Sequence, residues 1–137
     1  MATPIRTDDV ATACRIAGGH KREVGYVMRA TIETAARRGE LYVSPCGFGA
    51  AVVWRRRDLT TTLHTLAVEA PMRGQGVASG LLAHMVADSR AAGHTSIIAR
   101  CPTDLDVANG WYLRRGFAHI DTDPGKARPL NVWRLSL

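Results

Sequence analysis

Hydrophobic positions along this chain recur with two different periods, and the changes of period divide it into helices and strands. Apolar residues return at helical spacing over residues 8–17, 23–38 and 77–92. Runs rich in β-branched residues, or with a continuous apolar centre, predict strands at residues 4–6, 40–44, 48–56, 60–69, 95–101, 117–122 and 131–137. Thr7 or Asp8 is expected to cap the first helix, and Asp104 or Asp106 to cap a short helix that ends near residue 115.

The order of these elements, β-α-α-β-β-β-α-β-α-β-β, predicts a mixed α/β (α+β) fold with helices on both faces of one sheet. Three successive strands from residue 40 to residue 69 indicate an antiparallel meander. The strand, helix and strand over residues 60–101 indicate a parallel crossover. No linker or repeat interrupts the pattern, so residues 1–137 are expected to form a single domain.

Composition narrows the class of protein. Hydrophobic residues make up 46% of the 137 residues, as in globular proteins. No apolar run approaches the roughly 20 residues of a membrane span, and the N-terminal residues show no signal-peptide pattern, so a cytoplasmic location is expected. The three cysteines, Cys14, Cys46 and Cys101, form neither a disulfide framework nor a metal-binding spacing, and no metal is expected.

Positive charge is the most unusual feature of the composition. The formal net charge is +6, and all but two of the 18 basic residues are arginines. Such a balance favours a polyanionic ligand or an acidic partner, either a phosphorylated cofactor or RNA. Codon composition is an equal explanation for the arginine bias.

A glycine-rich turn at residues 73–78 lies between a predicted strand and a predicted helix. Glycines allow close backbone approach, and the first N–H groups of a helix have no partner within that helix. The turn therefore predicts an anion site, with an ordinary tight turn as the alternative.

Two motifs resemble those of the GNAT family of N-acetyltransferases. Leu66-Ala67-Val68, followed by Pro71 and Arg73-Gly74-Gln75-Gly76-Val77-Ala78, is similar to the family's acetyl-CoA motif, a strand and then R/Q-x-x-G-x-G/A. Tyr112-Leu113-Arg114-Arg115-Gly116-Phe117 is similar to its Y-x-x-x-G-F. The resemblance implies a GNAT-like acyl-CoA N-acyltransferase fold and direct transfer of an acetyl group from acetyl-CoA to a primary amine.

The resemblance also implies which residues bind the donor. The main chain of Leu66, Ala67 and Val68 would pair with the pantetheine arm where this strand splays from the strand at residues 97–101. The pyrophosphate would lie on the N–H groups of Gly74, Gln75, Gly76, Val77 and Ala78. Arg73 would add charge, and Ser79 would either bond to phosphate or simply occupy the first helical turn.

Tyr112 matches the family's tyrosine and is the candidate general acid for the departing thiolate, with a packed core tyrosine as the alternative. His64, or a water molecule, is the candidate base. His64 alternates with Leu66 and Val68 and is therefore expected to share their face. The stretch His64-x-Leu66-Ala67-Val68 is similar to the corresponding strand of the arylalkylamine acetyltransferases. Those enzymes carry a second histidine two residues earlier, where this chain has Thr62.

Other titratable residues are expected to be structural. Glu69 is predicted to be a solvated strand end, and Cys101 a core residue rather than a nucleophile. His20, His84, His94 and His119 are predicted to lie on the surface or in loops.

Several functional questions stay open. A toxin-like member that acetylates aminoacyl-tRNA and a non-enzymatic acyl-CoA-binding module are the alternatives to a small-amine acetyltransferase. The acceptor, the length of the acyl group and the oligomeric state, including a homodimer, are not predicted.

Overall fold

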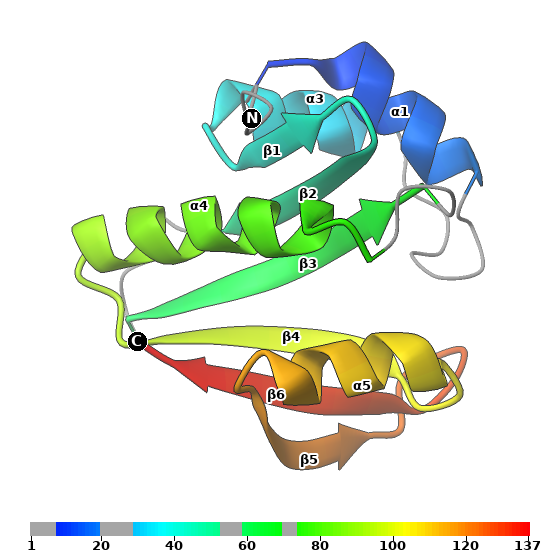
Figure 1. Cartoon of the computed structure of the whole chain (residues 1–137), viewed down its shortest axis with the longest axis vertical. Helices are drawn as coiled ribbons and strands as arrows, with labels where there is room; N and C mark the ends of the chain where they lie inside the picture. The colour runs from blue at the N-terminus through cyan, green and yellow to red at the C-terminus, as the bar shows by residue number, and fades with distance from the viewer. Residues whose placement is uncertain (1–7, 20–28, 53–58, 70–73) are drawn as a thin grey trace.

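The computed structural model describes residues 8–19, 29–52, 59–69 and 74–137, which include four helices and six strands (Figure 1). In chain order these are α1 (Val10–Gly19), α3 (Arg29–Arg37), β1 (Leu41–Ser44), β2 (Gly47–Val52), β3 (Thr60–Val68), α4 (Val77–Ala91), β4 (Ser96–Pro102), α5 (Asp106–Arg114), β5 (Ala118–Asp123) and β6 (Leu130–Ser136). The strand predicted at residues 4–6 lies outside the described residues. None of the described helices combines the length and the apolar character that crossing a membrane requires.

The strands form one mixed sheet in the order β1-β2-β3-β4-β6-β5. Its first three strands are antiparallel to one another, and β3 pairs in parallel with β4, to which α4 connects it. Strands β4, β6 and β5 are again antiparallel. The mixed α/β fold, the meander and the parallel pair are therefore confirmed.

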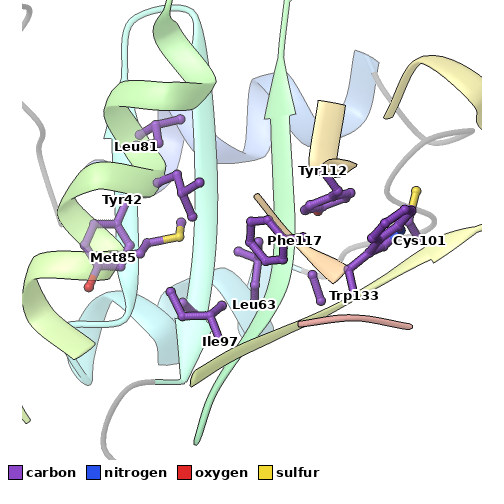
Figure 2. Packing of buried hydrophobic residues seen from close by; sticks show 12 residues of the cluster. Tyr42, Leu63, Leu81, Met85, Ile97, Cys101, Tyr112, Phe117 and Trp133 are labelled. Carbon is purple, nitrogen blue, oxygen red and sulfur yellow. The ribbon is translucent and has the colours of Figure 1, made fainter. Parts of the chain in front are cut away.

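The two faces of the sheet carry separate hydrophobic clusters. On the face covered by α4 and α5, Tyr42, Leu63 and Met85 belong to the larger cluster (Figure 2). On the face covered by α1 and α3, Ile16 and Phe48 belong to the smaller one. Alternate residues of single strands enter different clusters, as expected for a sheet that is covered by helices on both sides.

A β-bulge interrupts β3 at His64. Consecutive residues of β2, Ala50 and Ala51, pair with Thr65 and Leu63, so His64 is an extra residue on β3. A bulge bends its strand and breaks the alternation of side chains between the two faces. The bend coincides with the end of the β3–β4 ladder, whose last pair is Leu63 with Ala99.

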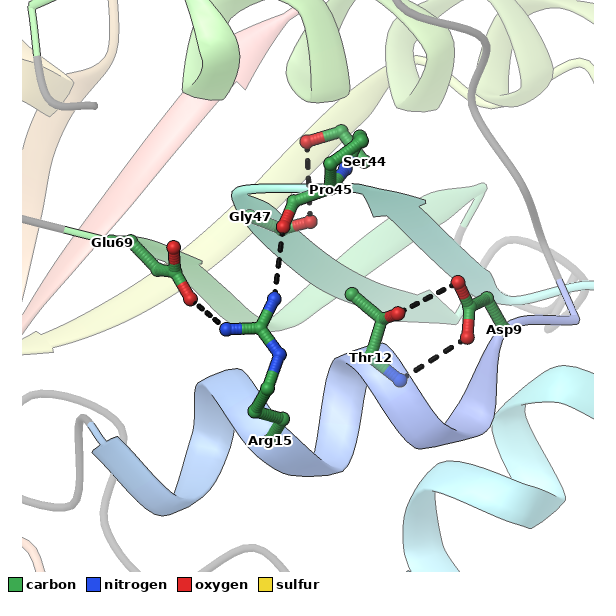
Figure 3. A network of polar contacts seen from close by, with 7 residues as sticks. All are labelled: Asp9, Thr12, Arg15, Ser44, Pro45, Gly47 and Glu69. Atoms are coloured by element: carbon green, nitrogen blue, oxygen red, sulfur yellow. Dashed lines mark hydrogen bonds and ion pairs between the residues drawn. The ribbon is translucent and has the colours of Figure 1, made fainter. Parts of the chain in front are cut away.

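Two predicted helix caps are wrong. Helix α1 begins at Val10, one residue later than an Asp8 cap predicts and two later than a Thr7 cap predicts. Asp9 caps it by accepting bonds from the Thr12 backbone N–H (3.1 Å) and hydroxyl (2.8 Å), shown in Figure 3. Leu105 occupies the cap position of α5 and makes no side-chain cap bond. Neither Asp104 nor Asp106 therefore caps α5, which is held by tertiary contacts instead.

His94 lies in the loop between α4 and β4, which confirms that part of its prediction, but it is buried rather than on the surface. Its side chain is 4% exposed, and its Nδ1 lies 2.8 Å from the Thr61 hydroxyl. Ser89 donates its hydroxyl proton to the Met85 carbonyl (2.7 Å), so it accepts the proton of Thr61, which lies 2.7 Å away. Thr61 must then accept from His94, which places the imidazole proton on Nδ1. The exposed positions of His84 and His119 are confirmed, and His20 lies outside the described residues.

We expect Thr61→Val to lower the free energy of unfolding by about 2–3 kcal/mol, because it leaves the buried Nδ1–H of His94 without an acceptor and removes one of the two hydrogen bonds of Ser89, while keeping the side-chain shape. Urea denaturation followed by circular dichroism measures the change. Thr62→Val, at the next position of the same strand, is the control and should stay within about 0.5 kcal/mol of the wild type. Equal losses in both variants would contradict the network.

Candidate functional site

A cavity of about 680 Å³ lies between the first turn of α4 and the helix α5, next to the end of β3. Most of the residues predicted to bind a donor line it: Leu66, Ala67, Val68, Gly74, Gly76, Val77, Ala78 and Ser79. Tyr112 lines it as well, from α5. Gln75 and His64 are not among the lining residues, and Arg73 lies outside the described part of the chain.

The divergence of two strands opens the sheet beside this cavity. The parallel ladder between β3 and β4 covers only Thr60–Leu63 and Ser96–Ala99, although β3 continues to Val68 and β4 to Pro102. The splay expected between these strands is therefore confirmed. Beyond the bulge β3 keeps its ladder with β2 alone, and its last residues, Leu66 to Val68, line the cavity together with residues of α5.

The glycine turn shapes the opposite end of the cavity. Gly74 and Gly76 have φ values of 78° and 82°, in the left-handed region that non-glycine residues rarely adopt. Gly76 is the cap residue of α4 and leaves the helix start without a side-chain cap bond. Among the described residues, and leaving aside the adjoining residues of the chain, no atom lies within 4 Å of the position that a Cβ would take at either glycine. The described residues thus leave room for a ligand beside this turn.

Tyr112 is both a packed core residue and part of the cavity wall. Its ring stacks on Trp133 at 6.2 Å and meets Phe117 edge-on at 5.1 Å (Figure 2). It also meets Trp111 edge-on, at 5.3 Å. Burial raises the pKa of the phenol above its ordinary value, and the neighbouring Cys101 raises it further. The hydroxyl therefore stays protonated across the neutral range and can donate.

Cys101 lies beside Tyr112 at the end of β4. Burial raises the pKa of its thiol to about 11, an effect that Arg128 opposes and Asp104 strengthens. A thiol with that pKa is almost entirely protonated at neutral pH and is a poor nucleophile. Its environment fits the predicted structural role.

The alternation from which the face of His64 was predicted is interrupted at that residue. Leu63 and Leu66 both pack in the cluster under α4, although they are three residues apart, because the bulge lies between them. His64 is exposed and is not among the residues that line the cavity. It lies at the residue where the two strands part.

Glu69 is a partly exposed strand end, and it also makes contacts that the sequence did not predict. The carboxylate forms an ion pair with Arg15 of α1, whose guanidinium also donates to the Pro45 carbonyl at 3.0 Å (Figure 3). The Glu69 backbone N–H donates to the Cys46 carbonyl at 2.8 Å. The end of β3 is thus fastened to the β1–β2 turn, residues 45–46, and to α1.

Asn109 is a structural residue of the site that the sequence does not reveal. Its amide nitrogen donates to the carbonyls of Pro102 and Leu105, both at 2.9 Å. Its oxygen accepts from the Trp133 indole (2.9 Å) and from Asn131 (3.1 Å). One side chain therefore fastens α5 to the ends of β4 and β6. No local pattern could predict this, because its partners come from three separate segments.

Charged groups lie at the two ends of α5. Asp104 and Asp106 line the cavity near the start of the helix, and Arg114 and Arg115 line it near the end. The Arg115 guanidinium lies over the Trp111 ring, 5.8 Å from its centroid. Within the described residues, no group of three or more His, Cys, Asp or Glu side chains is placed to hold a metal ion.

Comparisons with known proteins agree with this geometry. The family model described as "Acetyltransferase (GNAT) family" matches residues 17–117. Among solved structures, Ard1 from Thermoplasma volcanium is 22% identical, with a TM-score of 0.85 over 100% of this chain and 99% of its own. Comparison with curated proteins gave no match.

Two further structures contain coenzyme A or its acetyl ester. One is yncA from Salmonella typhimurium with acetyl-CoA (16% identity, TM-score 0.75, covering 99% of this chain and 94% of its own). The other is N-acetylglutamate synthase from Neisseria gonorrhoeae with coenzyme A and N-acetyl-glutamate (16% identity, TM-score 0.82, covering 100% of this chain and 35% of its own). At such low identities these likenesses describe the fold. The family model, which covers most of the chain and both motifs, shows that this protein belongs to the GNAT family of acetyltransferases.

Proposed function

We propose that this protein transfers an acetyl group from acetyl-CoA directly to a primary amine. The observation that carries the proposal is the cavity itself, which joins the uncapped start of α4 to Tyr112 along the end of β3. Acetyl-CoA in yncA and coenzyme A in N-acetylglutamate synthase, both of the same fold, support this choice of donor.

The two ends of the donor match different parts of the cavity. Backbone N–H groups at residues 74–78 and the positive end of the α4 dipole suit the pyrophosphate. Ser79 and Arg73 belong to the same proposed phosphate site. The main chain of Leu66–Val68 suits the amide groups of the pantetheine arm, which would add to β3 as a short strand.

The reaction needs a base for the amine and an acid for the sulfur. The amine nitrogen attacks the thioester carbon, the C–S bond breaks, and the thiolate leaves as coenzyme A. Tyr112, kept protonated by burial, is the proposed donor to that sulfur. His64 or a water molecule is the proposed acceptor of the amine proton.

The splay of β3 and β4 gives the amine a route to the thioester. The donor would lie on the α4–α5 face, and the amine would approach through the gap where the β3–β4 ladder ends, next to His64. Small amines, peptide amino groups and aminoacyl-tRNA stay open as acceptors.

The proposed phosphate site is tested by Gly76→Asp against Gly76→Asn. Both side chains tolerate the left-handed conformation and both are good helix caps, so neither should destabilise the fold. The aspartate places a negative charge at the pyrophosphate, and we expect it to weaken acetyl-CoA binding about tenfold or more relative to the asparagine. Calorimetric titration measures both affinities, and equal affinities would exclude the site.

Tyr112→Phe keeps the ring contacts and removes only the hydroxyl. We expect turnover to fall about tenfold or more, with acetyl-CoA affinity within about twofold of the wild type. Because burial raises the phenol pKa, loss of its proton should cause no fall in the wild-type rate below about pH 10. Release of coenzyme A from pH 6 to pH 10 is the measurement, and wild-type turnover in the variant would refute the assignment.

The base is tested by the pH dependence of the rate. Histidines ordinarily titrate near pH 6.5, so a histidine base predicts a rate that falls below about that pH. We expect His64→Ala to lose this acidic limb, whereas His84→Ala, an exposed histidine on α4, should keep it. An unchanged limb in His64→Ala would leave water as the base.

A further inference from the structure

Gly47, the first residue of β2, lies against the donor cavity without lining it. It is buried and pairs with Val68 in the β2–β3 ladder. A Cβ at this position would lie 2.9 Å from the Ala67 carbonyl oxygen, 3.0 Å from Val77 Cγ1 and 3.1 Å from Val68 Cγ2. All three of these neighbours line the cavity.

These distances are shorter than ordinary van der Waals contact, which begins near 3.5 Å for carbon atoms. The neighbours have little freedom to move aside, since one is a backbone oxygen and the other two are β-branched side chains with restricted rotamers. A methyl group at Gly47 would therefore displace the end of β3 or the start of α4. Val77 is the first residue of α4, so its displacement moves the N–H groups of the proposed phosphate site.

The β1–β2 turn next to Gly47 cannot relieve the crowding by swinging away. The Cys46 carbonyl accepts a bond from the Glu69 backbone N–H, and the Pro45 carbonyl accepts one from Arg15. Arg15 also pairs with the Glu69 carboxylate (Figure 3). The turn is fastened to α1 and to the end of β3, so the strain is transmitted to the cavity wall.

We propose that Gly47 is a positioning residue for the donor site: its missing side chain allows β3 and the first turn of α4 to approach to the separation that acetyl-CoA requires. The inference rests on the proposed function. It assigns a role in cofactor binding to a residue of the meander, which is outside both sequence motifs.

Gly49 provides a matched control on the same face of β2. A Cβ there would meet the terminal methyl group of Met85, the Thr65 carbonyl oxygen at 3.0 Å and Leu66 Cδ1 at 3.3 Å. Met85 lies in the third turn of α4, away from the phosphate site, and its side chain is flexible. A methyl group at Gly49 thus crowds the core and the side chain of Leu66, which lines the cavity, but none of its three nearest neighbours belongs to the first turn of α4.

The experiment compares Gly47→Ala and Gly49→Ala for acetyl-CoA affinity by calorimetry, for KM and kcat, and for urea stability. We expect Gly47→Ala to lose about tenfold or more in affinity and to raise KM for acetyl-CoA more than it lowers kcat. Gly49→Ala should lose stability and keep its affinity within about threefold. The double variant Gly47→Ala/Val77→Ala removes Val77 Cγ1, one of the three crowded neighbours, and should recover part of the lost affinity even if the single variant folds poorly.

Three results would overturn the inference: wild-type affinity in Gly47→Ala, an equal affinity loss in Gly49→Ala, or no recovery in the double variant. Wild-type protein is titrated first. If the wild type itself does not bind acetyl-CoA, the proposed donor is wrong and the role of Gly47 fails with it. Binding by the wild type with no difference between the two glycine variants refutes the role of Gly47 alone.

Discussion

The end of the β3–β4 ladder at Leu63 and Ala99 is the constraint on which the rest of the structure depends. Two neighbouring strands of a sheet ordinarily stay paired, because an unpaired buried N–H or carbonyl group is costly. Here the extra residue His64 bends β3 and ends the pairing. Each strand then continues with only its outer neighbour, and a cavity lies between the helices that cover the gap.

Different kinds of contact hold the covering helices on the two halves of the sheet. On the β3 side, α4 packs closely on β2 because glycines at positions 47 and 49 leave room for it. On the β4 side, the much shorter α5 is held by aromatic contacts of Tyr112 and by the four hydrogen bonds of Asn109. The cavity walls are therefore positioned by the sheet rather than by each other.

Periodicity and turn chemistry predicted all ten described elements, since each depends on neighbours along the chain. The cavity-lining glycines and Tyr112 were predicted because motif and helix position coincide there. The bulge at His64 was not predicted, because a bulge leaves no mark in a run of β-branched and apolar residues. The ion pair of Glu69, the burial of His94 and the bonds from Asn109 to β6 were not predicted either. Their partners lie 54, 33 and 22 to 24 residues away, so these contacts depend on tertiary packing.

The contacts that attach α5 to the sheet influence how this protein can change over evolutionary time. Asn109 and Tyr112 fasten the helix from its inner side, whereas Val107 and Leu113 are 78% and 64% exposed and contribute little to that attachment. Outer residues of the helix, including Val107 on the cavity wall, can thus be replaced without detaching it. Selection for a new ligand and selection for a stable fold act here on different positions, so one can proceed without opposing the other.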